Sequence, residues 1–468
     1  MNFHYILKNI SYSLFSNFIS ILGSILMIVI VPKFMSIEDY GAWQLFLFYF
    51  SYVGFLHFGW EDGIYLRYAG QKYSELNSKL FSGQIYGIVL LQIVLGLIIY
   101  FISEIYIVSL VKAQVISFVA VAMILANFNN FCNFILQITN RISRYAEIII
   151  LEQIVLISLV FLIIFLGFNR YTDLIYCKLL SLVAVSCFAG YAVKELLKPE
   201  FYNIREIVEE AKENISTGSK LMFANVAGML ILGIIRYGIS EGWDIATFGK
   251  ISLTLSISNF LMIFINAVSV VLFPILKHVE GTTLAPLYLK LRKGLSVIFL
   301  GLLITYYPIK EILVLWLPKY ADSLMYMAIL FPICLFESRV SLIINTYLKS
   351  MRQEKLMLKI NISAVIFSLM LTYIGIVLLH NLNISILFIV IAFAFRCILA
   401  EYWTTQLLDL HVRQETCKEL FLVLVFIFSS WYIAGWMGLI IYTVFYTLFL
   451  YKSRKQIISL YTELKKYK

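Results

Sequence analysis

Three arginines and two glutamates interrupt segments of the sequence that are otherwise strongly apolar. They are Arg236, Glu337, Arg339, Arg396 and Glu401. The planar guanidinium of arginine matches the oxygens of a phosphate and keeps its charge when it is partly dehydrated. We therefore predict that Arg236, Arg339 and Arg396 line a cationic cavity, which binds an anionic ligand such as a diphosphate or an acidic sugar.

Acidic residues predict a second role for the same cavity. Glu337 and Arg339 are two positions apart, so on a helix they project about 200° from one another and each needs its own neighbour. We expect Glu337, Glu401 and Asp62 to hold the arginines when the site is empty, or to bind a coupling ion. The alternative is structural: the charges tie helices together, and Arg236 reaches the outer headgroups.

The composition of the chain indicates which solvent surrounds the segments that carry these charges. Of 468 residues, 61% are hydrophobic and 14% are charged, and the mean hydropathy is +0.89. Soluble domains carry about a quarter charged residues. A chain this apolar cannot cover its core with a polar surface, so its solvent must be lipid. A charge at the centre of a membrane helix costs roughly 2.5–3.5 kcal/mol, which makes the deep charges functional candidates.

Apolar runs long enough to cross ~30 Å of hydrocarbon recur along the chain. We predict an all-α polytopic membrane protein with about 14 transmembrane helices, a 12-helix core followed by a C-terminal helix pair. The predicted spans lie near 10–34, 41–66, 84–105, 115–137, 148–168, 174–194, 217–239, 249–274, 294–317, 324–347, 360–379, 384–408, 420–434 and 437–451.

Lysine and arginine concentrate in the loops on one side of these spans. The positive-inside rule assigns this side to the cytoplasm, and both termini are predicted to lie there. Three of the loops contain Arg67, Arg141 and Arg352, which we expect at the cytoplasmic entrance of the cavity. For Asp62 and Arg67, an interfacial ion pair at the loop entrance is the alternative.

Two pairs of short motifs predict an internal duplication. IEDYG at 37–41 matches IATFG at 245–249, and NRISRY at 140–145 matches MRQEKL at 351–356 at nearly the same separation. An even number of spans in each copy gives both the same orientation, so we expect the substrate path between two lobes. The expected parts are an N-terminal six-helix lobe, a C-terminal six-helix lobe, and a helix pair with a basic cytoplasmic tail: 1–200, 205–410 and 411–468.

Several stretches of the chain are similar to one known group of transporters. They are VPKFMSIEDYGAW at 31–43, WEDGIYLRYAG at 60–70, ILQITNRISRYA at 135–146, VSVVLFPIL at 268–276 and FESRVSLIINTYLKSMRQEKLM at 336–357. They resemble the polysaccharide-exporter branch of the MOP (multidrug/oligosaccharidyl-lipid/polysaccharide) transporter superfamily, and most of all Wzx-type O-antigen flippases. The last stretch is the most specific.

The resemblance implies a flippase, which is a transporter and not an enzyme, in the bacterial inner (plasma) membrane. It would move an undecaprenyl-diphosphate-linked oligosaccharide, such as an O-antigen or related polysaccharide repeat unit, by alternating access and without a cofactor. Other partners would be membrane lipid, the polysaccharide polymerase machinery, and a proton or sodium gradient where an ion drives the cycle. Basic cavity residues meet the anionic substrate in this family, a role that falls here on Arg236, Arg339 and Arg396.

Two other functions compete with this one. A multidrug or cation exporter of the same superfamily would need buried acids and few deep cations, but the first span has no Asp or Glu between Ile10 and Val31. An O-antigen polymerase or a lipid-linked-sugar glycosyltransferase would need a sizeable outward loop. The acidic outward residues, Glu38 and Asp39, lie in a short one.

Other chemistries have little support in the sequence. The six cysteines form no CxxC pair, so we interpret them as small buried hydrophobes and expect no metal site. No phosphate-binding loop of the type G-x-x-x-x-G-K-[ST] occurs. The net charge of +10 follows from the basic cytoplasmic loops, and we expect no nucleic-acid partner.

Overall fold

The computed structural model describes residues 3–198, 203–258 and 281–466. Every regular element within these ranges is a helix. In the same residues, 11 helical segments are long and apolar enough to cross a membrane. The prediction of an all-α protein with many membrane spans is confirmed.

Those 11 segments coincide with 11 of the 14 predicted spans. The other three predicted spans have no counterpart among the 11 segments. The predicted span 41–66 is divided between two helices, α2 (Ile37–Phe50) and α3 (Trp60–Tyr68). Phe58 and Gly59 between them have positive φ angles of 54° and 85°. Because a right-handed helix cannot continue through such angles, the chain breaks before α3 begins.

The other two differences concern the ends of the described ranges. The predicted span 249–274 begins in α9 (Ile245–Ser258) and continues into 259–280, which lies outside the described residues together with the motif VSVVLFPIL. The predicted span 437–451 lies in α20 (Gly435–Lys466), which is not among the 11 segments. The total of about 14 spans and the side on which the termini lie stay predictions.

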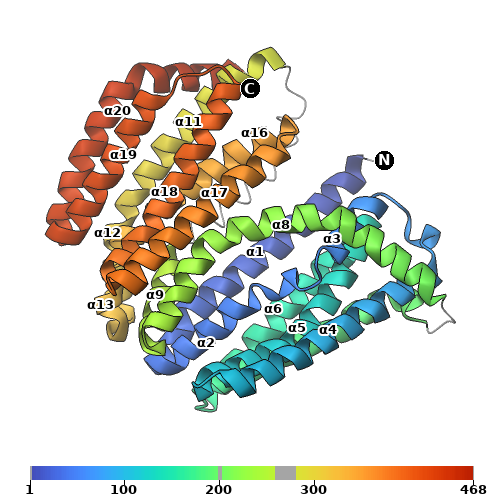
Figure 1. Ribbon diagram of the computed structural model, residues 1–468. Helices are drawn as coiled ribbons and strands as arrows, with labels where there is room; N and C mark the ends of the chain where they lie inside the picture. The colour runs from blue at the N-terminus through green and yellow to red at the C-terminus, as the bar shows by residue number, and fades with distance from the viewer. Residues whose placement is uncertain (1–2, 199–202, 259–280, 467–468) are drawn as a thin grey trace. The chain divides into compact units, whose positions relative to one another are not determined.

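The chain divides into two compact units (Figure 1). Unit 1 comprises Met1–Val226 and Ile245–Gly249, and unit 2 comprises Ala227–Asp244 and Lys250–Lys468. The division falls within the long helix α8 (Ile204–Gly242). The sequence analysis placed a boundary just before this helix and separated the last helix pair as a third part, and that division stays a prediction.

Unit 1 contains long helices that pack along one another in pairs. Besides α2, α3 and the first part of α8, they are α1 (Phe3–Phe34), α4 (Ser78–Tyr106), α5 (Leu110–Ile138), α6 (Ile142–Phe165) and α7 (Tyr171–Ala192). Helix α4 packs on α5, α1 packs on α6, and α7 packs on both α5 and α6. Phe81, Phe131 and Val185 belong to the buried core that α4, α5, α6 and α7 share with α3.

The two copies of the predicted repeat motif meet within unit 1. A Cβ atom on Gly41 of the first copy would lie 2.1 Å from the carbonyl oxygen of Ile245, and one on Gly249 would lie 2.5 Å from the Cα of Gly41. Only glycine permits so close an approach of two backbones. The shared glycine of IEDYG and IATFG therefore has a packing role.

Unit 2 contains both long helices and short helical pieces, in addition to the last part of α8 and most of α9. They are α11 (Gly281–Leu302), α12 (Tyr306–Trp316), α13 (Ala321–Leu324), α14 (Met327–Leu330), α15 (Ile333–Ser338), the π-helical η6 (Arg339–Ile344), α16 (Asn345–Ser350), α17 (Glu354–Thr372), the π-helical η7 (Tyr373–Leu378), α18 (Leu382–Leu407), α19 (Arg413–Phe428) and the π-helical η8 (Ser429–Ile433), followed by α20.

The segment Met327–Ser350 lies at the centre of unit 2. Of its most apolar window, 89% is buried, compared with 17% for Ile142–Phe165 in unit 1. This central segment carries Glu337 and Arg339, so their side chains meet protein and not lipid. Membrane proteins tolerate charged side chains where, as here, the charges face the interior of the helix bundle.

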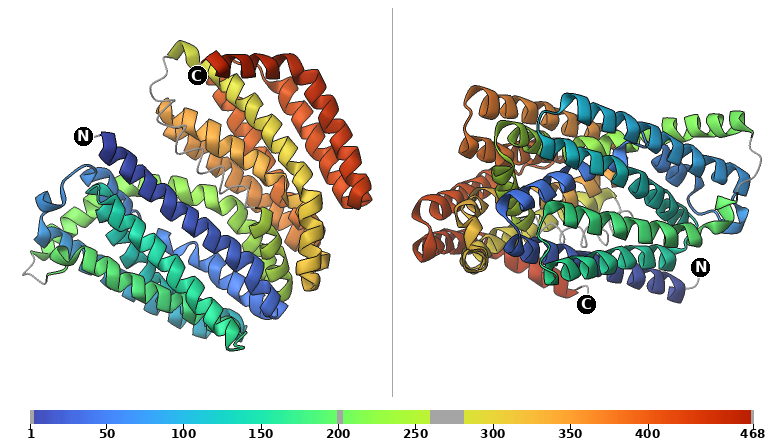
Figure 2. Two further views of the ribbon diagram at one scale, coloured as in Figure 1. Left: turned by 180° about the vertical axis from the view of Figure 1, so that it is seen from behind. Right: turned by 90° about the horizontal axis from the view of Figure 1, so that it is seen from below.

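The last helices of unit 2 form a layer beside α11. Helix α19 contacts α20, and both contact α11 (Figure 2). The chain turns between them at Ala434 and Gly435, whose φ angles are 55° and 54°. Helices α19 and α20 are therefore antiparallel neighbours, joined by a very short turn.

Candidate functional site

Four buried charges from four elements meet inside unit 2. Arg292 of α11 pairs with Glu401 of α18 through Nε and Oε1 at 2.6 Å, and with Glu419 of α19 through Nη1 and Oε1 at 3.1 Å. Arg339 of η6 pairs with the same two carboxylates, at 3.5 Å to Glu401 and 2.5 Å to Glu419. Each of the four side chains is at most 6% exposed. We call these four residues the buried ion network.

Two hydroxyl groups complete the buried ion network. Thr416 Oγ1 accepts a hydrogen bond from Arg292 Nη2 at 2.9 Å and lies 2.7 Å from Glu401 Oε2. Ser296 Oγ accepts one from Arg339 Nη2 at 2.9 Å. Two positive and two negative charges balance, and removal of one member of a buried pair typically costs 3–5 kcal/mol. The network therefore holds α11, η6, α18 and α19 together.

The other two deep arginines make separate contacts. Arg396 donates from Nη1 to Glu337 Oε2 at 2.8 Å and from Nε to Asn361 Oδ1 at 3.1 Å. Arg236 donates from Nη2 to Ser252 Oγ at 3.0 Å. The side chain of Glu337 is 20% exposed, so the Arg396 pair is less enclosed than the buried ion network.

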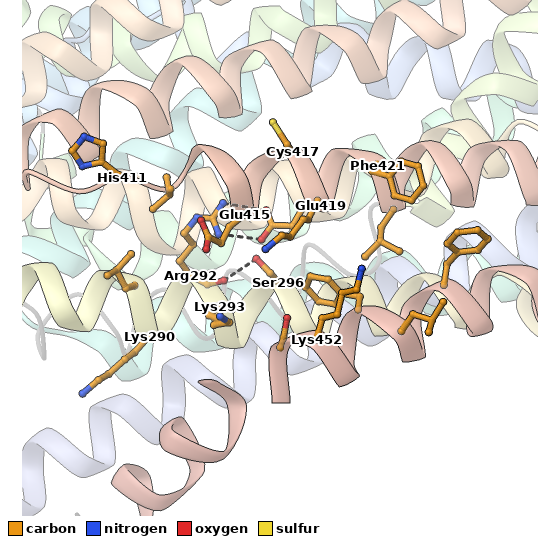
Figure 3. A pocket seen from close by; sticks show the side chains of 18 residues that line it. Lys290, Arg292, Lys293, Ser296, His411, Glu415, Cys417, Glu419, Phe421 and Lys452 are labelled. Carbon is orange, nitrogen blue, oxygen red and sulfur yellow. Dashed lines mark hydrogen bonds and ion pairs between the residues drawn. The ribbon is translucent and has the colours of Figure 1, made fainter. Parts of the chain in front are cut away.

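A groove of about 740 Å³ lies between α11, α19 and α20 (Figure 3). Among the described residues, its charged lining contains five basic residues and two acidic ones: Lys290, Arg292, Lys293, Lys418, Lys452, Glu415 and Glu419. Its apolar lining includes Phe421, Leu422, Phe445, Leu448 and Phe449. Arg292 and Glu419 belong to both the groove and the buried ion network.

The helices place the charges of the groove at one end. Lys418 precedes Phe421 by one turn on α19, and Lys452 follows Phe449 by one turn on α20. Because the two helices are antiparallel, both lysines fall at the same end and the aromatic residues lie beyond them. One end of the groove is therefore cationic, and we call this end its mouth. Apolar side chains line the rest of the groove, which we call its apolar channel.

The arrangement of helices matches solved structures of membrane transporters. A multidrug resistance MATE family transporter of the MOP superfamily, in an inward-facing conformation, matches with a TM-score of 0.65 and 15% identity over 84% of this chain and 94% of that one. The lipid II flippase MurJ matches with a TM-score of 0.59 and 15% identity over 95% and 99%. A MATE structure in the straight conformation matches with a TM-score of 0.53 at 15% identity.

The chain has the fold of MOP-superfamily transporters. No family model and no curated protein matches its sequence. The fold agrees with the resemblance seen in the sequence, whereas membership of the superfamily, of its polysaccharide-exporter branch and of the Wzx type stays a prediction.

Two of the three predicted acids lie next to predicted site arginines. Glu401 contacts Arg339, and Glu337 contacts Arg396. Glu337 and Arg339 do not pair with each other, and each finds a neighbour on another helix, as the 200° separation predicts. These contacts show which acids neutralise the arginines. Whether a ligand takes their place stays a prediction.

Asp62 lies in unit 1 beside a histidine. Its Oδ2 is 3.7 Å from Nε2 of His57, which also lies 3.9 Å from Oε2 of Glu61. His57 Nδ1 accepts a hydrogen bond from the backbone N–H of Gly59, so the neutral ring carries its proton on Nε2, toward the two acids. The cluster lies at the start of α3, at the break in the predicted second span.

The three residues predicted at the cytoplasmic entrance have different surroundings. Arg67 contacts Glu210, and it donates to Glu213 Oε2 at 2.6 Å, which ties α3 to α8. Arg141 lies 4.3 Å from the ring centroid of Tyr73. Burial, more than the nearby carboxylate of Glu195, raises the pKa of Tyr73 to about 12. Arg352 lies two residues after the central segment and has a φ of 55°.

The sequence analysis missed two members of the buried ion network. It left Arg292 just outside the predicted span 294–317, although Arg292 and the buried Ser296 are one turn apart on α11. It gave Glu419 no role. Glu419 shares a face of α19 with the buried Leu422 and Phe426, and this spacing of three and four residues was the available signal.

Proposed function

We propose that this protein is a flippase that moves an undecaprenyl-diphosphate-linked oligosaccharide across the bacterial inner membrane by alternating access. The fold supports transport, since the similar structures are those of transporters, one of which is named a lipid II flippase. The finer proposal depends on the chemistry of unit 2.

The groove is the observation that carries the proposal. A polyprenyl-diphosphate substrate has an anionic headgroup attached to a long apolar tail. The lysines at the mouth of the groove suit the headgroup, and the apolar channel beyond them suits the tail. A ligand that combines both properties fits this lining better than a sugar alone or an inorganic anion.

The deep arginines are the proposed ligands for the diphosphate during transport. Arg236, Arg339 and Arg396 would bind its oxygens, and Glu337 and Glu401 would neutralise Arg396 and Arg339 when the substrate is absent. The exchange of a carboxylate for a phosphate keeps the charge of the site balanced, which lowers the cost of a buried guanidinium.

The remaining roles follow from the predicted orientation. Arg67, Arg141 and Arg352 would form the cytoplasmic entrance, and Asp62 would bind a coupling ion if a proton or sodium gradient drives the cycle. The polysaccharide polymerase machinery would receive the repeat unit on the outer side.

The test measures flipping of a fluorescent undecaprenyl-diphosphate-linked oligosaccharide in proteoliposomes. The double variant Lys418→Gln/Lys452→Gln removes two charges from the mouth of the groove and should lower the rate about tenfold, since hydrogen bonds to charged groups contribute about 1.5–3 kcal/mol. The control is Lys72→Gln, at a lysine that is 81% exposed in unit 1. If the double variant flips at the rate of this control, the groove does not carry the substrate.

A multidrug exporter is the second candidate, because a MATE transporter has the same fold. The two functions differ in cells that lack the protein. Loss of a flippase leaves finished lipid-linked repeat units facing the cytoplasm, and loss of a drug exporter leaves their export unchanged. Loss of an O-antigen polymerase would leave single units already exported.

A further inference from the structure

Glu419 occupies a position in the groove that suits a bound anion. It lines the groove although it is only 4% exposed. Its Oε1 accepts from Arg292 Nη1 at 3.1 Å, and its Oε2 accepts from Arg292 Nη2 at 3.2 Å and from Arg339 Nη2 at 2.5 Å. A phosphate group can accept the same three hydrogen bonds from two guanidinium groups.

The two carboxylates of the network differ in their access to the groove. Glu401 binds the arginines from α18, and it is not among the described residues that line the groove. If Glu419 withdrew, two arginines would remain with one carboxylate, beside a groove lined by four lysines. The excess positive charge would lie where an anionic headgroup can reach it.

We propose that Glu419 is a built-in substitute for the phosphate of a lipid-linked substrate, and that an entering headgroup displaces its carboxylate from Arg292 and Arg339. The inference rests on the proposed function and deepens it. Arg292 becomes a substrate ligand alongside Arg339, and Glu419 is a competitor that the substrate must replace.

The displacement also removes a charged contact of the last helix pair. Glu419 ties α19 to α11 and η6. Elsewhere α20 is held to α11 by neutral hydrogen bonds, from Tyr442 Oη to Leu300 O at 2.8 Å and from Tyr446 Oη to Val297 O at 2.9 Å. An anion that replaces Glu419 leaves these bonds intact. Substrate binding would therefore loosen α19 at the mouth of the groove, where Thr416 still bonds Arg292 and Glu401, while α20 stays anchored.

The experiment measures the affinity of the purified protein for undecaprenyl diphosphate in lipid nanodiscs. Cys417 is exposed and lines the groove, so its protection from a maleimide reports binding. Cys187 on α7 is also exposed and serves as the control thiol. Undecaprenol, which has the same tail without phosphate, should protect neither thiol.

The decisive variants are Glu419→Gln and Glu415→Gln. Both remove one negative charge from the lining of the groove, but only Glu419 holds arginines. We expect Glu419→Gln to lower the Kd about tenfold, the equivalent of one charge-assisted hydrogen bond, and Glu415→Gln to change it at most about twofold. Equal effects of the two variants, or weaker binding by Glu419→Gln, would overturn the inference.

A third variant covers the case in which Glu419→Gln does not fold. Thr416→Val keeps every charge and removes the hydroxyl that joins Arg292 to Glu401, which loosens α19. We expect it to lower the Kd about threefold, less than the loss of a charge. An unchanged or higher Kd contradicts the inference.

The outcome also separates the inference from the proposed function. If the unmodified protein flips the oligosaccharide and binds undecaprenyl diphosphate, but Glu419→Gln does not tighten binding, only the inference fails. If the unmodified protein neither flips the substrate nor shows protection of Cys417, both fail.

Discussion

In unit 1 the buried polar side chains around the break between α2 and α3 include a set of amides, whereas those between α11, α18 and α19 of unit 2 are ions. Asn127 donates to Gln92 Oε1 at 2.7 Å and to the carbonyl of Val53 at 3.1 Å, and Gln92 donates to the carbonyl of Leu56 at 3.1 Å. The buried ion network also joins separate elements, but it does so through two arginines and two glutamates.

The amides and the ions differ in the free energy that the loss of one side chain costs. A neutral hydrogen bond contributes about 0.5–1.5 kcal/mol, and a truncated amide leaves only neutral groups behind. A truncated ion pair leaves an uncompensated charge in a region of low dielectric constant, which is far more costly. Amides suit a region that keeps one arrangement, whereas paired ions suit a region in which a charged ligand can exchange with an internal partner.

Substitution of Glu401 by alanine should have the largest effect on stability. Glu401→Ala leaves Arg292 and Arg339 to share Glu419, so the free energy of unfolding should fall by about 3–5 kcal/mol. The measurement is a denaturation curve of the purified protein in detergent. A loss of about 1 kcal/mol, as expected for a neutral hydrogen bond, would show that the network is not ionic in its energetics.

A double variant provides the control for that prediction. Arg339→Met/Glu401→Met removes one charge of each sign and leaves Arg292 with Glu419. Because the replacement of a whole buried pair by apolar groups is often nearly neutral, the double variant should be more stable than Glu401→Ala alone.

Substitution of the predicted site arginines should lower the flipping rate of the protein that folds and inserts. Arg339→Ala and Arg396→Ala should lower the flipping rate about tenfold, because each removes hydrogen bonds to charged groups. Arg339→Lys and Arg396→Lys should lower it less, since lysine keeps the charge but loses the planar fork. The flipping rate is compared with the amount of inserted protein. Normal flipping by both alanine variants would eliminate the cationic-cavity hypothesis.

The spans that the sequence predicted correctly depend on average properties of long segments. Length and apolar composition suffice to find a helix such as α6 or α18. The break before α3 depends on the left-handed conformation of two residues, and one of them is Phe58, whose type gives no sign of it. An apolar sequence from 51 to 59 therefore hid a change of backbone direction.

The site residues that the sequence found are those with conspicuous neighbours. Arg339 and Arg396 interrupt long apolar runs, so hydropathy alone indicates them. Arg292 and Glu419 lie just before the predicted spans 294–317 and 420–434, among charges that do face solvent, such as Lys418. Their burial follows from the way α11 and α19 pack on the central segment, which is a property of tertiary structure. A sequence pattern could suggest the buried face of α19 but not its partner.

Substitution of Asn127 should have the smallest effect and tests the neutral side of the comparison. Asn127→Ala removes two hydrogen bonds, to Gln92 and to the carbonyl of Val53, and should lower the free energy of unfolding by about 1–2 kcal/mol. No charge is left unpaired, so the loss should stay well below that of Glu401→Ala. The measurement is the same denaturation curve of the purified protein in detergent. A loss as large as that of Glu401→Ala would mean that amides and ions constrain their helices equally, and the distinction between the two regions would not hold.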